Sequence, residues 1–329
     1  MRRPFIDRWR YPILVEYAQR YAQFVSGNTT TFTPKQEEIL QVKKDVPGAQ
    51  LFRTDIGRSL WLGWFGMKDI ESVPWRDERV RQAISMLFDR AAFSEEFTNS
   101  AELVKGGLPA VETRWQSHVS PGHATYWLDP RKNELGDASK FWKYNPAEAN
   151  KLLEATGYKD GFTLPAFSNG GNNYGATYDR KVEITLDMWQ KGTKIKVNQQ
   201  RPMYTEWFAN YYNSPTRDFS DVAFWTNNLV RPDIDQDLFS TWHSKSGATF
   251  KGFKDARVDD LIEQQRKELD PQKRISIIHD LQRYLAPKMY AIPWEPLSSS
   301  YYFRWPWLRN SGFPGYDEWL SADMPRRNG

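Results

Sequence analysis

The pattern of apolar and polar positions along this chain of 329 residues predicts helices and strands that alternate. An amphipathic helix is expected over residues 77–93, because apolar residues recur there at intervals of three and four: Val80, Ala83, Ile84, Leu87 and Phe88. The apolar run at residues 60–66 is too short for a typical helix and favours a buried strand.

The same reasoning predicts the other elements. Further helices are expected at residues 17–25, 33–42, 145–157, 182–189 and 204–212, and a pair of helices at 255–286 whose first apolar face includes Leu269. Strands are expected at residues 11–15, 162–164, 195–197, 222–225 and 291–294. Helices that alternate with strands are typical of an α/β architecture.

Composition narrows the classes of function. The chain has 45 basic and 41 acidic residues, and a net charge of +4 without a basic cluster argues against a nucleic-acid partner. Cysteine is absent, which excludes disulfides and thiolate metal sites. The 15 Trp, 16 Tyr and 19 Phe fill either a large core or a ligand cleft.

Catalytic and metal-binding patterns are missing from the sequence, so no enzyme is predicted. It has no G-x-S-x-G, no Walker phosphate loop and no H-E-x-x-H motif. His118 and His123 lie in a long irregular segment at 98–140 without a matching carboxylate motif, so we expect neither a zinc site nor a cofactor. No apolar run reaches the length of a membrane span, and the basic start is not followed by the apolar region of a signal peptide.

Three segments carry a resemblance to a known family. They are residues 74–84 (PWRDERVRQAI) with Asp89 and Arg90, residues 144–155 (YNPAEANKLLEA) with Gly157 and Tyr158, and Asp270, Pro271 and Arg274 followed by Ile292 and Pro293. In this order the chain resembles the extracellular solute-binding proteins of family 5, which serve ABC importers of oligopeptides, dipeptides and nickel.

The resemblance implies an α/β fold of the periplasmic-binding-protein type, with two lobes of which one is largely complete and the other partial. Residues 1–62 would form the tail end of lobe I, residues 63–293 lobe II, and residues 294–329 the return to lobe I. The lobes would be joined through residues 61–66 and 292–294. Members of the family are longer at their N-terminus, so the chain is expected to be a truncated C-terminal portion or one part of a split gene, with the missing N-terminal half as a possible partner.

The implied function is capture of a small solute in an interlobe cleft and its delivery to permease subunits of an ABC importer, in the periplasm or at the extracellular face. The expected ligand loop contains Trp225, Asn227, Asn228 and Arg231. In peptide-binding relatives the position matching Asn228 is an Asp that pairs with the peptide's α-amino group. A neutral amide offers hydrogen bonds only, which favours a neutral or sugar-like solute over a free-amine peptide.

Three further tryptophans are candidate ligand-binding residues. Alternation along a strand places Trp61 and Trp64 on opposite faces of the sheet, so one ring can face the cleft while the other is core. Burial of both in the core is the alternative, and Trp294 has the same two alternatives. Two rival functions stay open: a glycoside- or peptide-cleaving enzyme with two separated carboxylates, and a non-functional truncated remnant.

Overall fold

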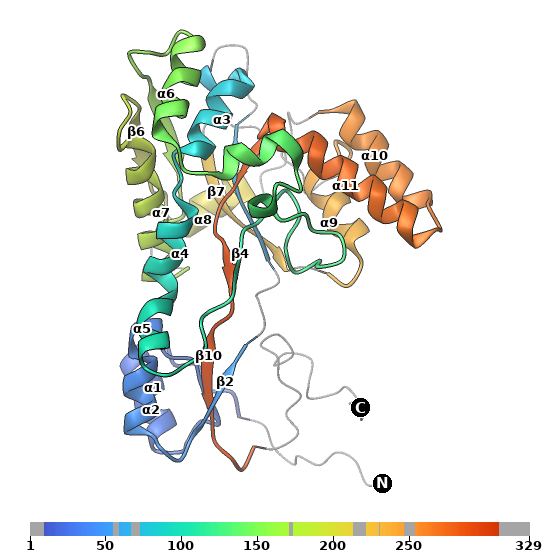
Figure 1. The fold of residues 1–329 in the computed structure, drawn as a ribbon. Coiled ribbons are helices and arrows are strands. Elements are labelled where there is room, and N and C mark those ends of the chain that lie inside the picture. Colours follow the sequence, from blue (N-terminus) through green and yellow to red (C-terminus); the bar gives the residue numbers. More distant parts are fainter. Residues whose placement is uncertain are drawn as a thin grey trace. The chain divides into compact units, whose positions relative to one another are not determined.

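The structure is a computed structural model that describes residues 10–54, 59–66, 73–170, 174–212, 222–229, 231–246 and 254–308, with the backbone alone described at 211–212 and 223–229. The chain divides into two compact units (Figure 1). The first comprises Met1–Asp55, Thr98–Val111 and Ser299–Gly329, and the second comprises Ile56–Phe97 and Glu112–Ser298. Among the described helices, none combines the length and the hydrophobicity of a membrane-spanning segment.

The second unit is built on a mixed sheet whose described strands follow the order β6-β5-β7-β3-β8. These strands are Lys196–Gln200 (β6), Thr163–Phe167 (β5), Val222–Leu229 (β7), Ser59–Phe65 (β3) and Ala291–Pro293 (β8). Strand β5 runs parallel to β6 and β7, whereas β3 is antiparallel to β7 and β8. A small second sheet pairs β4 (Thr113–Arg114) with β9 (Leu297–Ser298).

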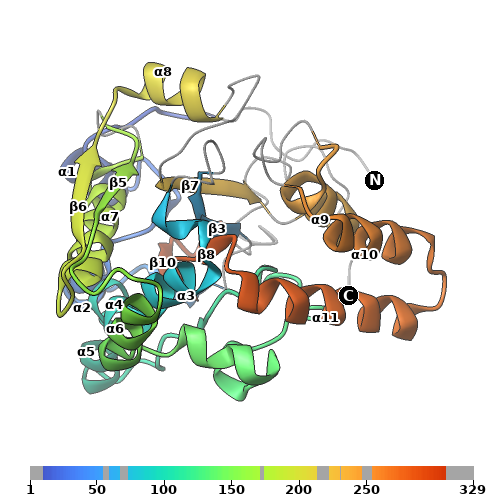
Figure 2. The same cartoon turned by 90° about the horizontal axis from the view of Figure 1, so that it is seen from above.

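Helices cover both faces of the main sheet. They are α3 (Glu78–Met86), α4 (Arg90–Thr98), α6 (Pro146–Ala155), α7 (Ala176–Gln190), α8 (Tyr204–Trp207), α9 (Ile234–Trp242), α10 (Ala256–Lys267) and α11 (Pro271–Lys288), with 3₁₀ turns at Pro74–Arg76, Pro130–Lys132 and Gly136–Trp142 and a π turn at Phe208–Tyr212. Figure 2 shows α6 and α7 on one side of β3 and β7 and α9, α10 and α11 on the other. The predicted alternation of helices and strands is therefore confirmed.

Strand β3 separates two hydrophobic cores because its successive side chains point to opposite faces. Trp61 and Phe65 contact the core formed with α3, α6 and α7, which we call the α7 face. Leu62 and Trp64 belong to the core formed with α9, α10 and α11, which we call the α11 face. The predicted buried strand at 60–66 is confirmed, and so is the division of its tryptophans between two faces.

The helix predicted over residues 77–93 is two helices. Its five apolar stripe residues are all fully buried, as predicted, but α3 ends at Met86 and α4 begins at Arg90. The chain turns here because the Asp89 carboxylate accepts hydrogen bonds from the backbone N–H groups of Ala91 and Ala92, which caps a new helix. The cap at Asp89 therefore starts a second helix, although the apolar residues continue at helical spacing.

Two smaller predictions are wrong. Residues 11–15 form no described strand, and Ile13 is 91% exposed, because an apolar extended segment becomes a strand only where a neighbouring strand pairs with it. Leu269 is 94% exposed, because α10 ends at Lys267 and Leu269 falls in the turn that precedes α11.

The predicted helix cap at Asn145 is confirmed, because its side chain accepts a hydrogen bond from the Glu148 N–H at 3.1 Å.

The first unit has its own small sheet, with described strands in the order β1-β10-β2. Its elements are α1 (Tyr17–Val25), β1 (Thr31–Phe32), a 3₁₀ turn (Gln36–Glu38), α2 (Ile39–Asp45), β2 (Gln50–Arg53), α5 (Ser100–Lys105) and β10 (Tyr301–Arg304). Leu103 of α5 is buried against Ile39 and Tyr301, which brings residues 98–111 into this unit. The segments 61–66 and 292–294, expected to join two lobes, belong to the second unit, where β3 ends at Phe65 and β8 at Pro293.

Candidate functional site

A break in the pairing of β3 and β7 marks the place where the predicted ligand residues lie. Ser59 is opposite Leu229 and Trp61 is opposite Thr226, so β7 carries one residue more than β3 between these pairs. The two residues of β7 at this point are Asn227 and Asn228. Such a bulge interrupts the ladder and redirects side chains, and bulges are common beside ligand sites.

The position of these asparagines differs from the prediction. Strand β7 continues to Leu229, so Trp225, Asn227 and Asn228 lie within the strand and not in a loop after residue 225. The neighbouring strand β3 supplies backbone partners on this side, which sustains a strand through polar residues that would otherwise favour a loop. Trp225 is opposite Leu62 in the register.

Arg231, the predicted ligand-binding cation, is paired with a carboxylate of α9. Its guanidinium donates to Oδ1 of Asp237 at 3.2 Å, and its backbone N–H donates to Oδ2 of the same carboxylate at 3.2 Å. His123 lies on the same carboxylate, with Nε2 at 2.7 Å from Oδ2. Arg231 therefore holds the chain after β7 against α9, and its charge is compensated.

Trp61 lies on the α7 face and is half-buried. Its indole N–H donates to Ser59 Oγ at 3.0 Å, and its backbone N–H donates to Gln116 Oε1 at 2.9 Å. The ring centroid is 5.7 Å from that of Trp294 and 6.4 Å from that of Tyr178. These contacts fix the orientation of the indole, and the residue as a whole is partly exposed.

Trp64 and Trp294 occupy core positions. Trp64 is 2% exposed and packs on Trp242 with ring centroids 5.0 Å apart, on the α11 face. Trp294 is 1% exposed, and its indole N–H donates to Thr185 Oγ1 at 2.8 Å. Neither ring offers surface for stacking in this structure, so among Trp61, Trp64 and Trp294 only Trp61 is partly exposed.

Two further buried polar residues, Tyr178 beside Trp61 and Asn169 beside Tyr178, were not predicted. Asn169, two residues after the end of β5, is 1% exposed, and neither Oδ1 nor Nδ2 of its side chain has a hydrogen-bond partner within the described residues. Tyr178 in the first turns of α7 is buried, which raises the pKa of its hydroxyl and keeps it neutral, and the backbone N–H of Asn169 lies next to that hydroxyl. The signal for Asn169 was its place directly after a strand, where ligands of α/β proteins commonly bind.

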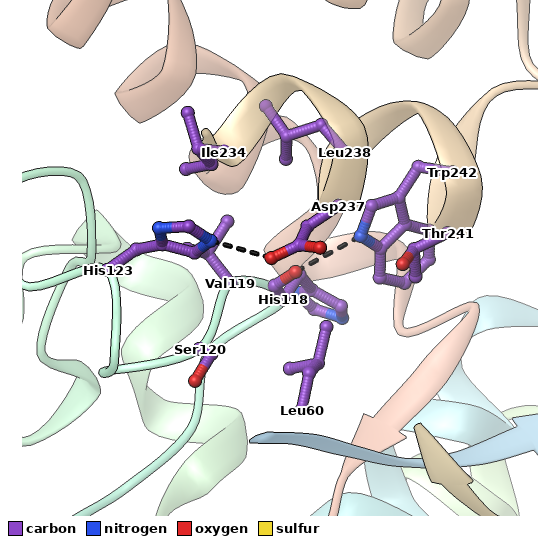
Figure 3. A pocket seen from close by; sticks show the side chains of 10 residues that line it. All are labelled: Leu60, His118, Val119, Ser120, His123, Ile234, Asp237, Leu238, Thr241 and Trp242. Atoms are coloured by element: carbon purple, nitrogen blue, oxygen red, sulfur yellow. Dashed lines mark hydrogen bonds and ion pairs between the residues drawn. The ribbon is translucent and has the colours of Figure 1, made fainter. Parts of the chain in front are cut away.

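The α11 face contains a cavity of a different kind (Figure 3). It measures about 10 Å³ and is lined by side chains that include His118, Ser120, His123, Asp237 and Trp242. A space of this size holds about one water molecule, far less than a peptide or sugar needs. Burial lowers the pKa of His118 to about 3, so the imidazole is neutral, and its Nε2–H donates to the carbonyl of Ala291 at 3.2 Å.

The polar groups of Ser120 and His123 beside this cavity are paired with different partners. Ser120 Oγ donates its proton to the carbonyl of Ser59 at 2.7 Å and not to His123. Figure 3 shows the His123 ring directed at the carboxylate of Asp237. Among the described residues no cluster of His, Asp and Glu is arranged to hold a metal ion.

Comparisons with known proteins agree with this fold. The family model for bacterial extracellular solute-binding proteins, family 5 Middle, matches residues 2–249. Di/tripeptide-binding protein 2 of Pseudomonas aeruginosa (strain UCBPP-PA14) is 22% identical over 273 residues, which cover 81% of this chain and 44% of that protein. The glutathione-binding protein GsiB of Pectobacterium atrosepticum is 28% identical over 144 residues, which cover 36% of this chain and 28% of that protein.

Solved structures show the same fold. The oligopeptide-binding protein AppA of Bacillus subtilis, in complex with a nonapeptide, matches with a TM-score of 0.66 and 18% identity over 93% of this chain and 57% of AppA. Lactococcal OppA in its closed conformation matches with a TM-score of 0.66 and 18% identity over 88% of this chain and 54% of OppA. The predicted periplasmic-binding-protein-like fold is thus confirmed, and the chain spans about half the length of these proteins or less. The match over residues 2–249 shows that the chain belongs to the bacterial extracellular solute-binding proteins of family 5.

Proposed function

We propose that the chain binds a small solute, releases it chemically unchanged, and delivers it to the permease subunits of an ABC importer. The observation that carries the proposal is the bulge at Asn227 and Asn228, which interrupts the strand ladder next to the partly exposed Trp61. An aromatic surface with a few polar groups beside it is the usual composition of a small-molecule site. Membership of a solute-binding family supports the same function.

The solute is proposed to be uncharged where it meets β7. Asn227 and Asn228 provide hydrogen bonds without a formal charge, and the cation that follows β7, Arg231, is paired with Asp237 at 3.2 Å. An amide or a hydroxyl satisfies such groups, whereas a free ammonium group needs a carboxylate partner. A peptide bound away from its amino terminus and a sugar-like solute both meet this requirement.

The function is proposed to be binding and not catalysis. Two carboxylates near the α7 face are held in ion pairs: Asp179 with Arg201 at 2.7 Å, and Glu295 with Lys181. Hydrolysis of a glycoside needs two carboxyl groups free to exchange protons with the substrate, which these ion pairs oppose. We place the protein in the periplasm or at the extracellular face, where the family acts, and no cofactor is needed for binding.

The decisive experiment is native mass spectrometry of the purified protein, followed by titration calorimetry with capped peptides and with oligosaccharides. We expect a small molecule to co-purify and one of the two ligand classes to bind in a saturable way. Trp61→Ala should weaken binding about tenfold, in keeping with the loss of one aromatic contact, and Trp61→Phe should recover most of it. The matched control is Trp307→Ala, which removes an exposed tryptophan of the first unit.

Two results would count against the proposal. Turnover of a bound peptide or glycoside at a rate proportional to protein concentration would show that the protein is an enzyme and not a binding protein. A wild-type protein that melts cooperatively yet binds neither peptides nor oligosaccharides would favour the non-functional remnant.

A further inference from the structure

Gln116 is a buried glutamine whose carboxamide joins β3 to the chain that follows β8. Its Oε1 accepts from the Trp61 N–H at 2.9 Å, and its Nε2 donates to the Glu295 carbonyl at 2.5 Å. We propose that Gln116 is a positioning residue for solute binding that acts by holding Trp61, and that Ser120 supports it through Ser59. The inference rests on the proposed function, because Trp61 belongs to the proposed site.

The pairing of β3 with β8 changes at Trp61. In an antiparallel ladder, the two residues of a hydrogen-bonded pair exchange both of their N–H···O bonds. The Trp294 N–H donates to the Trp61 carbonyl at 3.0 Å, directly after β8 ends at Pro293. The Trp61 N–H, however, donates to the side chain of Gln116. A side-chain amide therefore takes the place of a peptide group at the end of this ladder.

The carboxamide of Gln116 has one orientation that satisfies both of its partners. The Trp61 N–H needs an acceptor and the Glu295 carbonyl needs a donor, so an exchange of Oε1 and Nε2 would break both hydrogen bonds. The backbone of Gln116 is also held, because its carbonyl accepts from the Trp142 indole N–H at 2.8 Å. The place of the Trp61 backbone is thus set by a fixed group from outside the sheet.

A second contact from the same segment leads to the indole of Trp61. Ser120 Oγ donates to the Ser59 carbonyl at 2.7 Å, and Ser59 Oγ accepts from the Trp61 indole N–H at 3.0 Å. Ser59 and Trp61 are two positions apart on β3, so their side chains point to the same face of the sheet. Gln116 therefore holds the backbone of Trp61, and Ser120 holds the residue that orients its ring.

These contacts lie where the sheet is interrupted. Ser59 is opposite Leu229 and Trp61 is opposite Thr226, and the register of β3 and β7 shifts between these two pairs. The segment 116–120 therefore holds β3 on both sides of the bulge that carries the proposed site. A ring that is already oriented loses less conformational freedom when a solute stacks on it, so these contacts favour binding.

A double-mutant cycle tests whether Gln116 acts through Trp61. Affinities for acetyl-trialanine amide and for maltotriose are measured by titration calorimetry in wild type, Gln116→Met, Trp61→Ala and the double variant. For a probe that the wild type binds, Gln116→Met should weaken binding about fivefold, because the ring loses its fixed orientation. In the presence of Trp61→Ala the same substitution should change affinity less than about twofold, because the group that it positions is gone.

A spectroscopic measurement reports on the ring directly. In protein labelled with 5-fluorotryptophan, the ¹⁹F resonance that disappears in Trp61→Phe belongs to Trp61. Gln116→Met should shift or broaden this resonance without ligand. The matched control is Gln82→Met, which removes another buried carboxamide, one that donates to the Pro287 carbonyl at 2.7 Å. It should leave both the resonance and the affinity unchanged.

The outcomes separate this inference from the function on which it rests. Wild-type affinity in Gln116→Met, or an equal loss with and without Trp61, would overturn the inference and leave solute binding intact. If Gln116→Met does not fold, Ser120→Ala decides, since it removes one oxygen only. It should weaken binding about threefold, and only while Trp61 is present; an unchanged affinity would overturn the inference as well. Binding of neither peptides nor oligosaccharides would remove both proposals.

Discussion

Two buried carboxamides in the second unit have opposite surroundings. Gln282, on the α11 face, is fully buried and fully paired: Oε1 accepts from Ser117 Oγ at 2.9 Å and from the Leu128 N–H at 3.1 Å, and Nε2 donates to the Tyr126 carbonyl at 2.7 Å. Asn169, on the α7 face, is equally buried and has no described partner at either end.

The difference separates a polar group that the fold satisfies from one that it does not. On the α11 face the polar atoms of Gln282, His123 and Asp237 are paired within the protein, and the cavity lined by His123 and Asp237 measures about 10 Å³. The carboxamide of Asn169 has no partner at either end within the described residues, and its backbone N–H lies next to the hydroxyl of Tyr178. The contacts of the fold therefore explain why a carboxamide is buried at Gln282, but they do not explain it at Asn169.

The largest expected effect comes from the two tryptophans of β3. Trp64→Ala should lower the free energy of unfolding by about 3–5 kcal/mol, because a fully buried ring packed on Trp242 leaves a cavity. Trp61→Ala should cost about 1–2 kcal/mol, since its ring is only half-buried. Urea unfolding followed by circular dichroism measures both, and equal losses would remove the distinction between the two faces.

The second expected effect is a pH dependence located on the α11 face. Burial lowers the pKa of His118 from its ordinary value to about 3 in the folded protein. The unfolded chain therefore binds a proton below about pH 6.5 that the folded protein takes up only near pH 3, so stability falls as the pH decreases through this window. The loss between pH 7 and pH 4 from this group is about 3 kcal/mol.

His118→Gln isolates that contribution from the carboxylates that also respond to acid. Its side-chain amide can still donate to the Ala291 carbonyl, but it has no proton to gain. The difference in unfolding free energy between wild type and His118→Gln should stay nearly constant from pH 8 to pH 7. It should change several times more between pH 6 and pH 4, where the unfolded histidine is protonated and the folded one is not. A difference that stays constant from pH 8 to pH 4 would show that His118 is not neutral in the fold.

Local sequence patterns predicted much of the secondary structure, because neighbouring residues determine it. The apolar stripe from Val80 to Phe88 identified a buried helical face, and the residues Asn145 and Pro146 identified a helix start. The break at Asp89 was missed because its carboxylate caps two backbone N–H groups, a competing local interaction that hydrophobic periodicity does not register.

Features that depend on distant residues could not be predicted in this way. Strand β7 extends to Leu229 because β3 pairs with it, and the bulge at Asn227 and Asn228 arises from a register between segments more than a hundred residues apart. Whether Asn169 is paired depends on every residue that folds around it. Its position after a strand was visible in the sequence, but its unsatisfied amide was not.

The third expected effect is a loss of stability when the paired carboxamide is removed. Gln282→Met keeps the length of the side chain but leaves the Tyr126 carbonyl, the Leu128 N–H and the Ser117 hydroxyl without this partner. The unfolding free energy should fall by about 2–3 kcal/mol, the cost of buried groups left unpaired. A neutral result in urea unfolding would mean that water replaces the glutamine, and the α11 face would then be less tightly closed than its small cavity indicates.

The smallest expected effect has the opposite sign and separates the two faces most sharply. Asn169→Leu, a substitution of similar volume, removes two unpaired polar atoms from a buried site and should raise the unfolding free energy by about 1 kcal/mol, because desolvation of the amide is no longer required. The measurement is the urea midpoint of wild type, Asn169→Leu and Gln282→Met under one set of conditions without ligand. If both substitutions destabilise the protein alike, Asn169 has a partner in the folded state and serves the same structural purpose as Gln282. If Asn169→Leu alone is stabilising, the carboxamide of Asn169 is unpaired in the folded protein, unlike that of Gln282.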